Sequence, residues 1–232
     1  MDRRLLLWTA AAATLCLAVG LLGLDRPLVE FVRASGIEQA RVFAFGLAVL
    51  DTVSAFGLWI WAAGCATLLI GLAALAFRRN DRWPRALIAA AAVQLAAIAT
   101  MIQGKDYFGR LRPHQLLESG DWSHLWFAGG TSFPSGHSAF YFGLLLPLAA
   151  ACPIRWLRIV LVAIPVYVVL ARMDLQKHFL SDVSASALIA ATYALIAATL
   201  LRRWLPPPRH AWIRLRRRGA SEPIHLPQVG EN

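Results

Sequence analysis

Residues 131–150 read TSFPSGHSAFYFGLLLPLAA, a polar Pro-Ser-Gly-His stretch that leads directly into a long apolar run. Ser135 is a residue type that commonly caps a helix N-terminus, so this stretch predicts a helix that begins near Ser135. The apolar run behind it predicts that the helix lies in a membrane. A histidine at the edge of hydrocarbon is costly unless it has a partner or a chemical role, so His137 is a candidate functional residue.

The rest of the chain contains further apolar runs. Hydrophobic residues make up 58% and charged residues only 16% of the 232 residues, which is far from the balance of a soluble domain. Because a helix needs about 20 apolar residues to cross a bilayer, the sequence predicts an all-α, polytopic membrane helix bundle with about six transmembrane helices. The predicted spans are Leu5–Leu24, Ala55–Phe77, Arg85–Gln103, Ser138–Ala151 (extended back to Ser135), Trp156–Ala171 and Leu180–Leu201.

Two segments fall outside these spans. Glu30–Asp51 mixes charges with Phe and Leu, which predicts an interfacial helix between the first two spans. The chain after the last span predicts a basic polar tail at 204–232, following a membrane-embedded domain at 1–203. The first span has an alternative interpretation as a cleaved signal peptide, although its apolar length favours a retained span.

Basic residues alternate between the connectors. Of the 23 Lys and Arg residues, 15 lie before the first span, in or at the borders of the second and fourth connectors, and after Leu201. The positive-inside rule therefore predicts that both termini are cytoplasmic and that the first, third and fifth connectors face outward. The net charge of +10 follows mainly from this pattern and from the Arg-rich tail. We interpret the tail as an anchor on anionic membrane lipids and expect no nucleic-acid partner.

The third and fifth connectors carry the chemically interesting side chains. Lys105 and Arg112 are two helical turns apart, and Pro113 predicts that the helix carrying Lys105 ends at Arg112. Two cations near a helix end can bind an anion, and arginine can do so with a bidentate fork. Taken alone, these residues could equally be basic side chains that extend to the interface.

His178 and Asp182 have the spacing of neighbours on one helix face. A carboxylate one turn away can fix the tautomer of an imidazole and leave its other nitrogen free to act as a nucleophile or base. Ser135 and Gly136 stand where the free amides of a new helix would point outward, which is a favourable place for a phosphate. With Arg172 these segments supply three cations, two histidines and one carboxylate, but no cluster of metal ligands, so we expect neither a metal nor another cofactor.

Three motifs in this order resemble the type 2 phosphatidic acid phosphatase superfamily. They are Lys-x6-Arg-Pro at Lys105–Pro113, Pro-Ser-Gly-His at Pro134–His137, and Arg-x5-His-x3-Asp at Arg172–Asp182. Each motif is weakly specific, but the three together with intact spacing are strongly specific. Ala171 stands where the superfamily commonly has serine, which removes a hydroxyl contact but none of the charged or imidazole groups.

The resemblance implies a role for each matching residue. His178 would attack phosphorus and form a phosphohistidine, Asp182 would hold its ring, and His137 would protonate the leaving oxygen and then activate water. The phosphoryl oxygens would be held by Lys105, Arg112, Ser135, Gly136 and Arg172. Two histidines, His114 and His124, match no motif position and are interpreted as loop or surface groups. Asp51 is interpreted as polar packing between helices rather than as a catalytic residue.

The resemblance also implies that the substrate is a lipid phosphate. The six spans with little sequence outside them, together with the pattern of basic residues, predict a bacterial inner-membrane protein whose active site faces the periplasm. Phosphatidate, phosphatidylglycerol phosphate, undecaprenyl pyrophosphate and lipid A are the candidates. The envelope lipids are favoured, and nothing in the sequence decides between undecaprenyl pyrophosphate and lipid A or indicates an oligomeric state. The alternatives are a phosphotransferase between lipids, a soluble vanadium-dependent haloperoxidase, which the hydrophobicity argues against, and a non-catalytic membrane transporter or structural protein, which leaves the three motifs unexplained.

Overall fold

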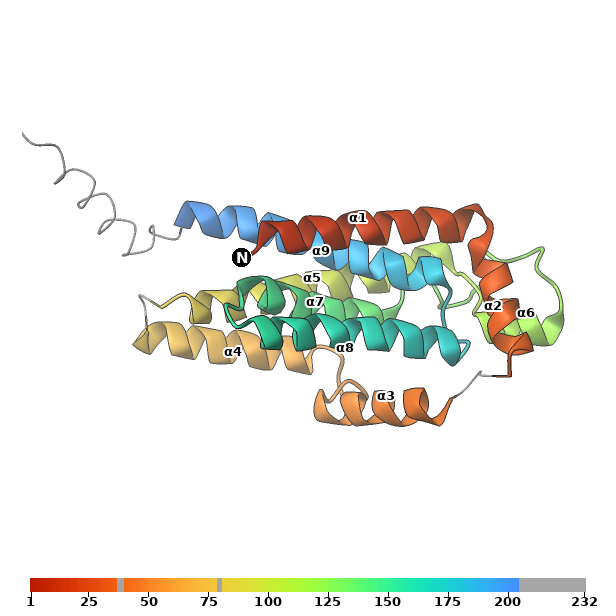
Figure 1. The fold of residues 1–232 in the computed structure, drawn as a ribbon, viewed down its shortest axis with the longest axis horizontal. Helices are drawn as coiled ribbons and strands as arrows, with labels where there is room; N and C mark the ends of the chain where they lie inside the picture. The colour runs from red at the N-terminus through yellow and green to blue at the C-terminus, as the bar shows by residue number, and fades with distance from the viewer. Residues whose placement is uncertain (37–39, 79–80, 205–232) are drawn as a thin grey trace, which may run out of the picture. The chain divides into compact units, whose positions relative to one another are not determined.

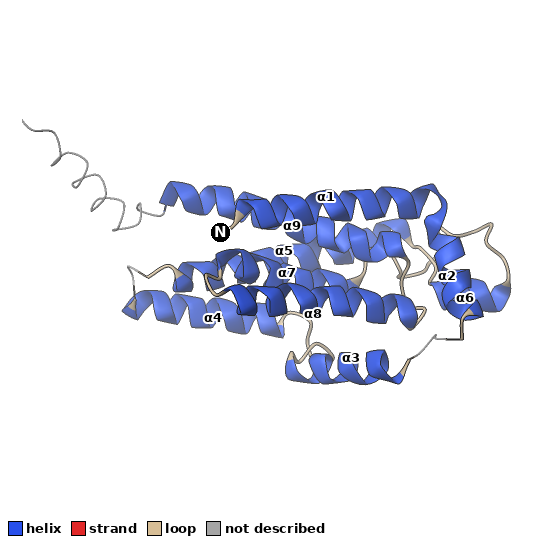
Figure 2. Cartoon of the chain, viewed as in Figure 1, coloured by secondary structure: helices blue, strands red, loops and turns tan. Residues whose placement is uncertain are grey.

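The computed structural model describes residues 1–36, 40–78 and 81–204, and within these ranges the chain forms helices joined by loops, with no β-strand (Figures 1 and 2). This confirms the predicted all-α helix bundle. Residues 1–198 form one compact unit, and the described part of the second unit is only the end of the last helix. Apart from Trp204, the predicted tail at 204–232 lies outside the described residues.

The helices follow one another closely along the chain. In order they are α1 (Arg3–Val19), the π-helical turn η1 (Gly20–Leu24), α2 (Asp25–Ala34), α3 (Arg41–Val53), α4 (Ala62–Phe77), α5 (Trp83–Phe108), α6 (Pro113–Ser119), α7 (Gly136–Ala151), α8 (Arg155–Asp174) and α9 (Leu180–Trp204).

Four helical segments are long and apolar enough to cross a membrane: Arg3–Ala34, Trp83–Ser119, Arg155–Asp174 and Leu180–Leu201. The two other predicted spans correspond to α4 and α7, which are apolar but only 16 residues long. At 1.5 Å per residue such a helix covers about 24 Å, so neighbouring loop residues would be needed to complete a crossing of about 30 Å. The helices therefore fit a polytopic membrane protein.

Three boundaries differ from the sequence prediction. The predicted connector helix at Glu30–Asp51 is two helices, α2 and α3. The second span begins at Ala62 instead of Ala55, because Ala55 adopts a left-handed conformation (φ 55°) that starts a series of turns. The helix carrying Lys105 ends at Phe108, with Gly109 (φ 52°) as its C-cap, and not at Arg112; Pro113 instead begins α6.

The core of the unit is made by neighbouring helices in two groups. Helices α4, α5, α7 and α8 pack in succession, and α7 approaches α5 so closely that a Cβ on Gly143 would lie 2.8 Å from the Cα of Gln94. Helices α1 and α9 lie side by side (Figure 1), and their small and apolar residues share a buried cluster with Val93 of α5 and Phe142 of α7. Because Leu6 of α1 is fully buried in this cluster, the first span is part of the folded domain.

Candidate active site

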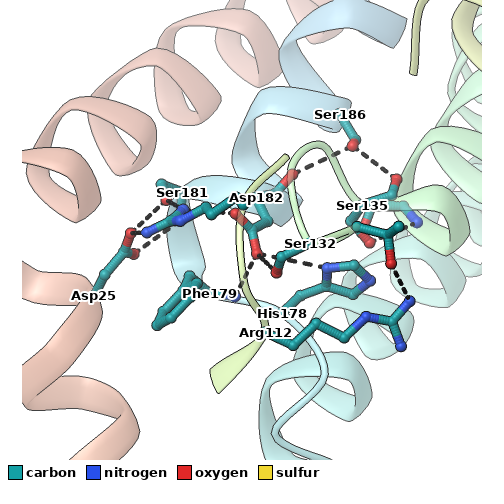
Figure 3. Close-up of polar contacts among 12 residues, drawn as sticks. Asp25, Arg112, Ser132, Ser135, His178, Phe179, Ser181, Asp182 and Ser186 are labelled. Carbon is teal, nitrogen blue, oxygen red and sulfur yellow. Dashed lines mark hydrogen bonds and ion pairs between the residues drawn. The ribbon is translucent and has the colours of Figure 1, made fainter. Parts of the chain in front are cut away.

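The polar residues of the three motifs meet at one end of the helical unit. Here α5 and α8 end, while α7 and α9 begin. The backbone of Ser135, just before α7, donates a hydrogen bond to the carbonyl of Asp182 in the first turn of α9 (3.1 Å). The hydroxyl of Ser186 then donates to the carbonyl of Ser135 (2.8 Å). These bonds connect the Pro-Ser-Gly-His segment to the helix that follows His178 (Figure 3).

His178 and Asp182 lie together, but not as neighbours on one helix face. His178 precedes α9, and Asp182 is in the first turn, where its Oδ2 accepts the backbone N–H of Phe179 (2.9 Å). This bond caps the helix and places Oδ2 3.5 Å from Nδ1 of His178, a contact longer than a normal hydrogen bond. The other ring nitrogen, Nε2, makes no hydrogen bond to the described residues, so it is available for chemistry.

Burial controls the charge of His178. Its side chain is only 2% exposed. Burial lowers the pKa of His178 to about 3, although the Asp182 carboxylate acts in the opposite direction. The ring is therefore neutral at ordinary pH, which is the state that a nucleophilic nitrogen requires.

Asp182 is held by a buried polar network (Figure 3). Its Oδ1 accepts from Nη1 of Arg110 at 2.6 Å, and its Oδ2 accepts from the hydroxyl of Ser132. Arg110 also donates from Nη2 to Asp25 of α2 at 2.7 Å. The guanidinium is 1% exposed and lies 4.3 Å from the ring centre of Trp126. A buried charge needs such partners, so this network fixes the position and the charge of Asp182.

Three cations of the motifs form a cluster in the site. Lys105 at the end of α5 donates to the carbonyl of Thr131, and Arg112 donates to its hydroxyl (3.2 Å). Lys105 interacts electrostatically with Arg112 and with Arg172 of α8. The Nε of Arg172 is buried and has no hydrogen-bond partner in the described part of the chain. Like charges held close together repel one another, so this arrangement favours a bound anion.

The start of α7 provides backbone donors beside these cations. Ser135 is the N-cap, and its hydroxyl accepts from the N–H of Ser138 at 3.4 Å. Gly136 is the first residue of the helix, and a Cβ built on it would lie 3.6 Å from Met101 and 4.0 Å from Cε of Lys105. The glycine therefore faces the side of the site that Lys105 occupies, where free amides at a helix N-terminus suit a phosphate.

His137 has a partner from an unexpected helix. Its Nε2 lies 2.9 Å from Oδ2 of Asp51, near the end of α3. His137 also interacts electrostatically with Arg172 and Lys105. The site thus contains two carboxylate–imidazole pairs, together with the cation cluster formed by Lys105, Arg112 and Arg172.

The comparison with protein families adds an independent observation. The model of the PAP2 superfamily matches residues 83–206, which is more than half of the chain and includes all three motifs. The chain belongs to this superfamily. Membership supports a phosphatase that hydrolyses lipid phosphates in general, and the apolar helices fit the membrane setting of such an enzyme. No curated protein and no solved structure matches the chain.

The structure brings every residue of the predicted PAP2 site to one end of the unit. These residues are Lys105, Arg112, Ser135, Gly136, His137, Arg172, His178 and Asp182. His114 and His124 bond to other groups: His114 to the carbonyl of Gln176 (3.0 Å), and His124 to the exposed Ser123 (2.7 Å). No group of three His, Cys, Asp or Glu residues that could hold a metal occurs within residues 1–36, 40–78 and 81–204. The expected absence of a metal stays a prediction.

Sequence reasoning missed part of the PAP2 site. Arg110 lies inside the first motif, but nothing in the sequence shows that it pairs with Asp25 and Asp182 instead of extending to solvent. Asp51 was expected to make polar contacts between helices, and it does so by bonding the histidine of the second motif. An isolated carboxylate within an otherwise apolar stretch was the available signal for this contact.

Proposed function

We propose that this protein is an integral membrane lipid phosphatase that hydrolyses a phosphate monoester or pyrophosphate of an envelope lipid through a phosphohistidine, without a metal ion. The observation that carries the proposal is the neutral, buried His178 beside three cations and the free amides at the start of α7. Fixed positive groups can stabilise the charge on a transferring phosphoryl group as a metal ion would.

Each candidate residue has a role in this reaction. Nε2 of His178 attacks phosphorus while Asp182 holds the ring through Nδ1. His137 gives a proton to the leaving oxygen as the P–O bond breaks. Lys105, Arg112 and Arg172 bind the phosphoryl oxygens together with Ser135 and the amide of Gly136. His137 then takes a proton from water, the water oxygen attacks phosphorus, and the P–N bond breaks to restore His178.

The proposed location is the bacterial inner membrane, with both termini in the cytoplasm and the site facing the periplasm. Two features support a common side for the N-terminus and the α7–α8 connector: Asp2 pairs with Arg158 at 2.8 Å, and both regions are basic in sequence. In a cysteine-free background, a cysteine at the exposed Ser119 should react with an impermeant thiol reagent in intact spheroplasts. One at Ile154 should react only after permeabilisation, and the reverse pattern would move the site to the cytoplasm.

The activity is tested by phosphate release from a panel of lipid phosphates in detergent with excess chelator. We expect release from at least one substrate among phosphatidate, phosphatidylglycerol phosphate, undecaprenyl pyrophosphate and lipid A. Vanadate should inhibit by occupying the phosphoryl position. A strict requirement for divalent metal, or the absence of release from every substrate, would contradict the proposal. Phosphate transfer to an added acceptor lipid without release would instead favour the phosphotransferase.

A further inference from the structure

Asp51, near the end of α3, uses both of its carboxylate oxygens to bond side chains of α7. Its Oδ2 is 2.9 Å from Nε2 of His137, and its Oδ1 accepts a hydrogen bond from the hydroxyl of Tyr141 at 3.0 Å. The side chains of Asp51 and His137 are 25% and 14% exposed. Both carboxylate oxygens are thus used, one by the imidazole and one by a residue a single helical turn further along α7.

The segment after α3 completes an enclosure around the same imidazole. The hydroxyl of Ser54 lies 3.0 Å from that of Tyr141. The centre of the Phe56 ring lies 3.9 Å from that of the His137 ring, and Phe56 also packs edge-on against Phe140, with ring centres 5.0 Å apart. The imidazole is therefore held by a carboxylate at one nitrogen and by a neighbouring aromatic ring. Its second nitrogen, Nδ1, makes no hydrogen bond to the described residues.

Because Nε2 of His137 is the nitrogen that contacts Asp51, the proton that the ring can transfer must be on Nδ1. A carboxylate at Nε2 keeps a proton on that nitrogen, so the neutral ring has its lone pair on Nδ1. When the ring is protonated, Nδ1–H is the proton it can give away, and the carboxylate stabilises the imidazolium. The other charged groups that act on His137 are the cations Lys105 of α5 and Arg172 of α8. Asp51 is the carboxylate that contacts the ring.

We propose that Asp51 is the positioning residue of His137, so that α3 supplies the second carboxylate of the reaction. This inference rests on the proposed function. In the first half-reaction, Nε2 of His178 bonds to phosphorus, the P–O bond breaks, and the leaving oxygen takes the proton from Nδ1 of His137. In the second, Nδ1 recovers a proton from the attacking water and the P–N bond breaks. Asp51 holds Nε2–H throughout and exchanges no proton.

If Asp51 positions His137, its loss should affect substrates with poor leaving groups more than substrates with good ones. A purely structural role would affect both equally. A substrate with a good leaving group, such as p-nitrophenyl phosphate, needs little help from a general acid in the first half-reaction, whereas an alkyl phosphate needs it fully. Loss of Asp51 should therefore slow the hydrolysis of the alkyl phosphate by roughly 10²-fold or more, which is the lower end of the usual range for acid–base catalysis. Phosphoenzyme formation from the nitrophenyl substrate should be nearly unchanged, while its hydrolysis by water slows.

The experiment compares wild type, Asp51→Asn and Glu30→Gln in detergent. Glu30→Gln is the matched control, because it makes the same carboxylate-to-amide change at an exposed ion pair with Arg26 on the neighbouring α2. Asp51→Asn should give a burst of nitrophenolate close to one equivalent per enzyme, followed by slow turnover, and should lose its activity on the alkyl phosphate. Glu30→Gln should behave like wild type, and Asp51→Glu should recover part of the alkyl activity.

Two results would overturn the proposal. One is Asp51→Asn activity within a few-fold of wild type on both substrates. The other is an equal loss of activity on both substrates, without a nitrophenolate burst, while Asp51→Asn unfolds at the same temperature as wild type. If Asp51→Asn does not fold, Tyr141→Phe serves instead: it removes only the hydroxyl that holds Oδ1 and should give a smaller, equally selective loss on the alkyl phosphate. A wild-type enzyme that hydrolyses neither substrate nor any lipid phosphate would refute the proposed function itself.

Discussion

Arg110 and Asp182 form a buried ion pair, with Nη1 of the guanidinium 2.6 Å from Oδ1 of the carboxylate and neither side chain more than 1% exposed. The same guanidinium pairs with Asp25 of α2 at 2.7 Å. The first span and its following helix are thereby linked to the carboxylate beside His178. A residue that no motif assigns to catalysis thus determines where the carboxylate of the predicted nucleophile pair lies.

Arg110→Met should destabilise the protein strongly, because it leaves two buried carboxylates without their counter-charge. Breaking a buried ion pair in this way typically costs about 3–5 kcal/mol. Thermal unfolding in detergent measures the change, and Arg26→Met, at a side chain that is 58% exposed, is the control and should have little effect. Adding Asp25→Asn to Arg110→Met should recover part of the loss. Equal unfolding temperatures for Arg110→Met and wild type would show that the pair is not needed.

Gly136→Ala should reduce phosphate binding without unfolding the protein. A Cβ there meets no protein atom closer than 3.6 Å, so the fold can accept the methyl group, but the group faces the space beside Lys105. Losing one hydrogen bond between an amide and the phosphoryl group would cost ~1.5–3 kcal/mol, which is at least about tenfold in the vanadate inhibition constant. Gly57→Ala, where a Cβ has no neighbour within 4 Å, is the control. Unchanged inhibition would remove Gly136 from the phosphate site.

Arg172→Lys should impair catalysis although the charge is kept. The buried Nε of Arg172 has no hydrogen-bond partner within the described ranges, and an ammonium group cannot supply the planar fork of donors. The expected loss is ~2–4 kcal/mol of transition-state stabilisation, or roughly 30- to 1000-fold in kcat/KM. Arg26→Lys at an exposed position should change kcat/KM little. Near-wild-type activity of Arg172→Lys would mean that other groups hold the phosphoryl oxygens.

The burial of His178 should make stability depend on pH. The pKa of this imidazole falls from 6.5 to about 3 on folding, so the unfolded chain binds a proton that the folded chain does not bind between these values. The contribution of the neutral His178 to the free energy of unfolding is therefore fully present above pH 6.5 and decreases as the pH falls from 6.5 toward 3. The decrease is up to about 2 kcal/mol between pH 6.5 and pH 5. Over that interval the unfolding temperature of His178→Gln should fall less than that of wild type. An equal fall in both proteins would show that His178 is not buried in its neutral form.

Much of the fold and the motif residues of the site could be predicted from the sequence, because both depend on local patterns. The apolar run Leu180–Leu201 predicts α9 to within three residues at its end, and the motif spacing brings His178 and Asp182 together. The details of that pairing were wrong, since the carboxylate caps the helix that His178 precedes. The left-handed C-cap at Gly109, which separates Lys105 from Arg112, is a local glycine signal that hydrophobic periodicity does not encode.

The contacts of Asp51 and Arg110 could not be predicted because both join residues that are far apart in the sequence. Asp51 is 86 positions away from His137, and the two meet where the end of α3 contacts the start of α7. Arg110 contacts Asp25 across 85 positions. Both are long-range pairs formed by loops whose course has no sequence period. In each case the sequence shows a charge near an apolar region but not its partner.

The central claim is that His178 carries the phosphoryl group, and trapping the phosphoenzyme tests it most directly. His137→Ala incubated with a good leaving-group phosphate should accumulate the intermediate, because the ring that activates water is absent. After alkaline quenching and digestion, mass spectrometry should locate one phosphoryl group on His178, and His137→Ala/His178→Ala should show none. Phosphate on another residue, or turnover by His178→Ala within a few-fold of wild type, would contradict the account.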